Sequence, residues 1–266
     1  MTEITNQAKQ PFLAQALSLI ASKLTNQSRQ LHLTFEKDHP NGYHNFIHVS
    51  TVTEAASLLI DSATKNNDPF NLSQQLDQYN ISHHTNFHLD NFYHICQIAF
   101  SLHDTGNICQ VNQSGQPVYL PYYTASDSEI RSQSNATNLL NLNPVFQNLS
   151  SQYQSDVLSL VNYLISHTVY QETNLDQPFA TFVKVCDQIG ILLLTSQQEI
   201  NRQQQGLIAE IATENPQWRL ENPDQFFNFV HHRFPILVPD DQTRQAILDI
   251  WQVSMPNYQS NPPDLP

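Results

Sequence analysis

Two histidines one helical turn apart mark the first segment that could do chemistry. The stretch "YHNFIHV" (43–49) places His44 and His48 four residues apart, so on a helix their imidazole rings would share one face. Further along, "SLHDTG" sets His103 beside Asp104 at the end of an apolar run. Adjacent side chains point apart within a regular helix, but near a helix end both can reach one centre.

A second acidic residue, Asp187, lies within the otherwise apolar stretch "VKVCDQIG". A buried carboxylate is unfavourable unless it is paired or binds a metal, and nearby Lys184 or a helix cap is the alternative partner. Each histidine taken singly is more commonly a surface or hydrogen-bonded core residue. The ordered set H…HD…D is more specific, because two imidazoles and two carboxylates form a site suited to Mn, Fe, Co, Ni or Zn that leaves room for water and substrate.

The elements that must position these residues are predicted to be helices. Glycine is scarce, at 5 residues, and apolar residues mostly recur at helical spacing. Helices are expected at 12–24, 43–60, 91–104, 125–142, 155–168, 178–194 and 240–252. The polar stretch 61–89 is expected to be loop with a short helix, and 105–124, with its glycines and prolines, to be loop. Without a repeat or a convincing linker, the chain is predicted to be a single all-α domain.

Composition narrows the class of protein further. The 266 residues include 39% hydrophobic ones, enough for a substantial core, and the net charge of −13 disfavours a nucleic-acid scaffold as partner. The three cysteines form no CxxC pair, so no disulfide framework is expected, and Cys96 and Cys186 lie in apolar runs. No apolar run reaches transmembrane length and no signal peptide is recognisable, so the expected location is the cytoplasm, without a membrane partner.

The motifs resemble those of the HD superfamily of metal-dependent phosphohydrolases, in particular its small predicted members. "YHNFIHV" is similar to the first motif of that superfamily, and "SDSEIRS" resembles the Asn-Glu-x-x-Ser segment that follows the HD pair. "LISHTVY" and "FVKVCDQIGIL" are similar to later segments. The resemblance covers about residues 10–195 and implies a single HD-type helical domain. Beyond this core we expect a helical extension at 196–255 and a disordered tail at 256–266.

The resemblance also implies roles, carried over by position. The metal ligands would be His48, His103, Asp104 and Asp187. His44 matches a histidine that acts as general acid in the phosphodiesterases of the superfamily, and Glu129 matches the glutamate of the Asn-Glu-x-x-Ser segment. Glu129 is therefore the candidate for orienting or deprotonating the water; the alternative is a solvated residue in the first turn of a helix.

Three further residues are candidates for the site. Arg131 and Lys184 could contact phosphate oxygens, although a structural or surface role is the commoner one for each. His167, which lies between the HD pair and Asp187, would line the pocket as a catalytic residue or serve as an extra ligand. The dinuclear members of the superfamily use two or more histidines in that interval, and this chain has one, so the resemblance favours a single metal ion over two.

The sequence thus predicts an enzyme that hydrolyses a phosphoester of a small molecule, with nucleotides among the candidates, by a metal-activated water. Two alternatives stay open: an HD-type diiron oxygenase, and a non-catalytic helical module that binds a metabolite. "NFVHHRFPIL", with His231, His232 and Arg233, could contribute to the pocket or form a surface turn.

Overall fold

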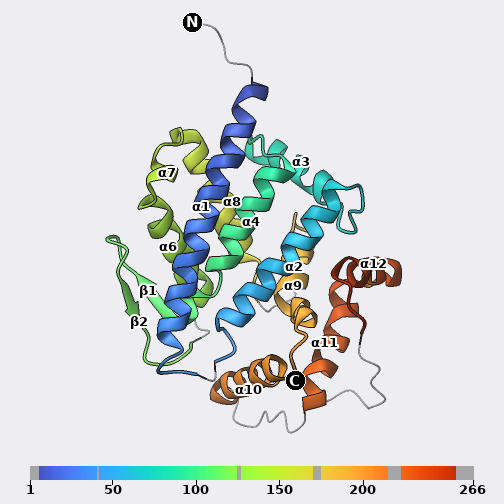
Figure 1. Ribbon diagram of the computed structural model, residues 1–266. Helices are drawn as coiled ribbons and strands as arrows, with labels where there is room; N and C mark the ends of the chain where they lie inside the picture. The colour runs from blue at the N-terminus through green and yellow to red at the C-terminus, as the bar shows by residue number, and fades with distance from the viewer. Residues whose placement is uncertain (1–5, 41, 125–126, 170–174, 215–222, 256–266) are drawn as a thin grey trace, which may run out of the picture.

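The computed structural model is mainly helical, and helix α4 (Leu89–Leu102) lies at the centre of the packing (Figure 1). Helices α1 (Asn6–Phe35), α2 (Phe46–Thr64) and α8 (Ser151–Ser166) pack against it. The structure describes residues 6–40, 42–124, 127–169, 175–214 and 223–255. The predicted all-α class is confirmed, with one small sheet in addition.

Apolar periodicity explains why these helices form the core. On α1 one face is fully buried, with Leu13, Leu17, Ile20 and Leu24 each at 0% exposure. Helix α4 is apolar on nearly all sides, as expected for a helix that neighbours surround. A polar contact aligns the two, because the Ser28 hydroxyl of α1 donates to the carbonyl of Ser101 near the end of α4.

The segment 105–124 differs from the predicted loop. It forms a short helix, α5 (Thr105–Ile108), and a two-stranded antiparallel sheet of β1 (Cys109–Val111) and β2 (Pro117–Tyr119), which pairs Gln110 with Val118. Strands of three residues leave too little alternation to be recognised in a sequence. The hairpin is held on α6 (Ser128–Asn141), whose Asn135 accepts from the Val111 amide at 2.7 Å.

The other predicted helices are present with shifted ends. Helix α3 (Leu72–His83) lies in the polar stretch, and α7 (Pro144–Gln147) precedes α8. The predicted helix 178–194 is α9 (Ala180–Ile189) followed by the 3-10 turn η1 (Gly190–Leu193). At this turn a side chain on Gly190 would come within 3.0 Å of the Ala55 methyl group, so glycine permits the close approach of η1 to α2.

The residues beyond 195 contain α10 (Gln197–Glu214), α11 (Pro223–Leu237) and α12 (Asp241–Trp251). Helix α11 continues through Pro235, and α12 is anchored on α2 because the Trp251 indole donates to the Ala55 carbonyl at 3.2 Å. The tail 256–266, predicted to be disordered, lies outside the described residues. The three cysteines are free; Cys96 and Cys186 are buried, as expected, and Cys109 is buried as well.

Candidate metal centre

His48 is placed in the first turn of α2 by the cap before it. The Asn45 side chain accepts hydrogen bonds from the backbone amides of Ile47, at 2.8 Å, and His48, at 3.1 Å, which otherwise have no partner at a helix start. The helix therefore begins at Phe46, and the prediction that His44 and His48 share one helix face was wrong. His44 precedes the cap, yet its ring still lies 5.8 Å from the His48 ring.

His103 and Asp104 follow directly after the last residue of α4, as the helix-end argument required. The His103 Nδ1 lies 2.7 Å from the Phe100 carbonyl oxygen. A carbonyl can accept but not donate, so Nδ1 carries the proton and a neutral ring presents a lone pair at Nε2. That tautomer is the one a metal ligand needs.

Asp187, on α9, is the fourth residue of the group. Its Oδ1 lies 3.1 Å from the His48 Nε2 and 3.3 Å from the His103 Nε2. The Asp104 Oδ2 lies 3.3 Å and 3.2 Å from the same two nitrogens. All four predicted ligands therefore converge, although up to 139 positions separate them in the chain.

The separations suit a divalent ion. Ligands about 2.0–2.1 Å from a tetrahedral zinc ion stand roughly 3.3 Å from one another. The His103 Nε2 is buried without a hydrogen-bond partner, although two carboxylate oxygens lie within ion-pair distance. Atoms so arranged could share a divalent ion, or a proton in its absence. The residues present thus fit a site with two nitrogen and two oxygen ligands.

The electrostatics of the centre also call for a positive charge. Burial raises the pKa of the Asp104 carboxyl, but the His103 and His44 rings outweigh it and hold that pKa well below its ordinary value. Burial is likewise outweighed at Asp187, where His103 and His48 lower the pKa to about 2. The pKa of His103, lowered by burial, is raised to about 10 chiefly by Asp104. Both carboxylates are ionised at neutral pH; a proton on His103 balances one of these charges, whereas a divalent ion would balance both.

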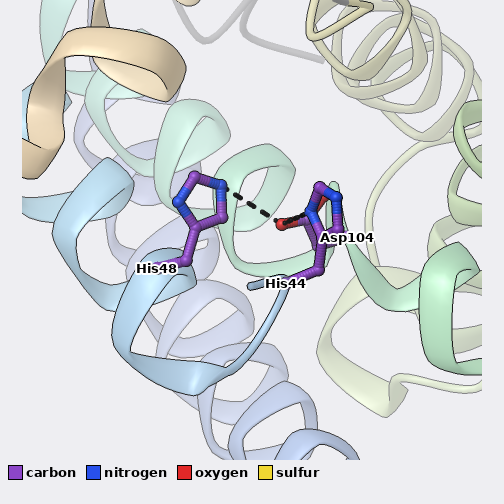
Figure 2. Close-up of side chains that lie close together, drawn as sticks. All are labelled: His44, His48 and Asp104. Carbon is purple, nitrogen blue, oxygen red and sulfur yellow. Dashed lines mark hydrogen bonds and ion pairs between the residues drawn. The ribbon is translucent and has the colours of Figure 1, made fainter. Parts of the chain in front are cut away.

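His44 forms the accessible edge of the centre (Figure 2). Its Nδ1 lies 2.9 Å from the Asp104 Oδ2, and because that carboxylate is ionised, the imidazole donates the hydrogen bond. The His44 side chain is 24% exposed, against 3% for His48 and 1% for His103. A molecule approaching from solvent would therefore meet His44 before the buried imidazoles.

In the described part of the chain, no hydrogen bond or ion pair joins two of the predicted catalytic residues to the four ligands. His167 ends α8, where its Nδ1 donates to the Tyr163 carbonyl at 2.8 Å, and burial lowers the pKa of its ring. Glu129 lies in the first turn of α6, as expected, and accepts from the Ser128 hydroxyl at 3.1 Å. Their catalytic roles stay predictions.

The two predicted phosphate-binding cations are engaged with backbone carbonyls. Arg131 donates to Gly106 at 2.7 Å and to Thr124 at 3.2 Å, so it ties α6 to the segment after the HD pair. Lys184 is buried on α9 and donates to the Val169 carbonyl. These contacts give both residues a structural role, and phosphate binding by either stays a prediction.

Sequence reasoning missed His32, a fully buried histidine on α1. Neither of its ring nitrogens makes a hydrogen bond of ordinary geometry, although the His44 backbone lies near enough to raise the pKa of the ring. Burial lowers the pKa of His32 to about 4, opposed most strongly by the Asp104 carboxylate, so the neutral ring lies close to the centre. Within "RQLHLTF" (29–35) the residue occupies an ordinary buried helix position, and nothing in that spacing distinguishes it.

No protein-family model, curated protein or solved structure matches this chain. The resemblance to the HD superfamily rests on the motifs quoted above alone and stays a prediction. Among the described residues, no helix combines the length and apolar character that crossing a membrane requires.

Proposed function

We propose that this protein is a metal-dependent phosphohydrolase that cleaves a phosphoester of a small molecule, with nucleotides as one candidate class. The observation that carries the proposal is the convergence of His48, His103, Asp104 and Asp187, whose facing donor atoms lie 3.1–3.3 Å apart. The phosphoester as substrate is inferred from the order of these residues, which resembles that of HD phosphohydrolases.

The same four residues would hold the ion, one of Mn, Fe, Co, Ni or Zn. Bound there, it would supply Lewis acidity and an activated water near neutral pH. The protein contributes the placement of the ligands on α2, directly after α4 and on α9, and α2 packs against both of the other helices.

His44 is suited to donate a proton to the departing oxygen. Its Nδ1 donates to the Asp104 carboxylate at 2.9 Å, which fixes the orientation of the ring. The partly exposed ring can then deliver its other proton toward a substrate held at the accessible edge. Asp104 would thereby serve two functions, one toward the ion and one toward the acid.

The test compares two variants with the wild-type protein after the metal has been restored. A panel of phosphomonoesters, phosphodiesters and nucleotides is screened, and metal content is measured on the same samples. His48→Ala should lose both metal and turnover. His44→Gln should keep the metal but lose about 10²–10⁴-fold in turnover, the usual size of an acid–base contribution.

His94→Gln, on the solvent side of α4, is the matched control and should behave as wild type. Undiminished hydrolysis by His48→Ala would contradict the assignment of the site. Failure of the metal-loaded wild-type protein on the whole panel would contradict the proposed reaction.

A further inference from the structure

Helix α10 docks onto the segment that carries the first two histidines of the centre. In Figure 1 it lies across the ends of α1 and α2. Arg202 pairs with Glu36 at 2.6 Å, just beyond the end of α1. The next residue, Gln203, is 0% exposed and donates to the Asn45 side chain at 2.7 Å. The Gln203 amide bonds to Asn45 in either of its two orientations.

A glycine one turn further along α10 allows this close approach. A side chain on Gly206 would lie 2.5 Å from the Tyr43 backbone nitrogen and 2.6 Å from the Gly42 carbonyl carbon. Both obstacles are backbone atoms, so they could not swing aside. The helix backbone therefore rests directly against the backbone that precedes His44.

The groups that α10 contacts are those that fix the start of α2. The Glu36 Oε1 accepts from the Phe46 amide at 2.8 Å while its other oxygen pairs with Arg202. Asn45 caps the amides of Ile47 and His48 with its side-chain oxygen, and the same side chain bonds to Gln203. The cap, the turn before it and α10 thus form one hydrogen-bonded unit with the metal ligand His48 at its edge.

We propose that Arg202, Gln203 and Gly206 are positioning residues of the metal centre, through which the C-terminal helices set the placement of His44 and His48. The proposal rests on the metal site of the proposed function but not on the reaction it catalyses. Groups that orient metal ligands in this way commonly change metal affinity about 10- to 100-fold when they are removed.

The experiment uses Co²⁺ as the probe with the full-length chain. The dissociation constant is measured by competition with a chelator, and the visible absorption of bound Co²⁺ reports the geometry of its ligands. Gln203→Ala should weaken binding at least about tenfold and alter the absorption bands. Gln205→Ala is the matched control, because it removes an exposed glutamine from the same helix; it should bind as wild type does.

Unfolding of each metal-free variant is followed in parallel, so that a general loss of structure is recognised. Arg202→Met, at a partly exposed position, provides a second variant that leaves the core intact and should also weaken Co²⁺ binding. Wild-type affinity in both Gln203→Ala and Arg202→Met would overturn this proposal and leave the metal centre standing. Failure of the wild-type chain to bind Co²⁺ would overturn the metal centre itself, and the proposal with it.

Discussion

Replacing the buried His32 by leucine should stabilise the metal-free protein. Each ring nitrogen buried without a hydrogen bond costs about 1–3 kcal/mol. Leucine has no ring nitrogens, so both of these costs disappear. An imperfect fit of the leucine side chain would destabilise the protein by up to about 1.5 kcal/mol. The free energy of unfolding should therefore rise by at least about 0.5 kcal/mol at pH 7.

The gain should grow as the pH falls. The pKa of His32 is lowered from 6.5 to about 4 in the folded protein, so the unfolded chain binds a proton there first. A lowered histidine pKa makes stability fall as the pH drops below 6.5, and the loss levels off below about 4. At pH 5 this amounts to about 2 kcal/mol for the wild type, which the leucine variant does not lose.

Urea unfolding at pH 7 and pH 5, with chelator present, measures both effects. His94→Leu, at a partly exposed position on α4, serves as the control and should change stability by less than about 0.5 kcal/mol at either pH. A His32→Leu protein that is less stable than wild type, with no difference between the two pH values, would refute the reasoning, because it would mean that the ring is hydrogen-bonded in solution.

Three further predictions concern the ion and the cap. A divalent metal at about 1,000 times its dissociation constant should raise the free energy of unfolding by about 4 kcal/mol, seen as a higher melting temperature that chelator reverses. Metal binding should release close to one proton per chain near pH 7.5, because the pKa of metal-free His103 is raised to about 10. Calorimetry in buffers of different ionisation enthalpy measures this proton release. A binding enthalpy that does not depend on the buffer would contradict the prediction. Asn45→Ala should lower the free energy of unfolding by about 1–2 kcal/mol and also weaken metal binding. Asn143→Ala, which removes the cap of α7, should lower stability without changing metal affinity. Equal metal affinities in these two variants would contradict the link from the cap to His48.

The convergence of the candidate ligands could be predicted in part from the sequence, because two of them are acidic residues in apolar surroundings. Asp104 ends an apolar helix and Asp187 interrupts one, and such carboxylates need a charged partner. The start of α2 could not be placed by apolar spacing, which runs through Tyr43 without a break. The side chain of Asn45 decides it, by capping two amides that the sequence pattern does not distinguish from others.

Other features depend on contacts that have no local signature. His32 occupies an ordinary buried position on α1. Its relation to the candidate metal centre appears only through the nearby charge of Asp104, 72 positions later in the chain. The docking of α10 depends on Gln203 and Gly206, which lie in a polar stretch that reads as a solvated helix. Such long-range packing of polar groups is where sequence patterns carry least information.

Metal analysis of the purified protein tests the central claim most directly. After exposure to Mn, Fe, Co, Ni or Zn and removal of excess ion, elemental analysis should find about one bound divalent ion per chain for the preferred metal. Asp187→Asn keeps the shape of the side chain and removes its charge, and should lose that ion. A wild-type protein that retains none of these metals, or an Asp187→Asn variant that retains as much as wild type, would contradict the account.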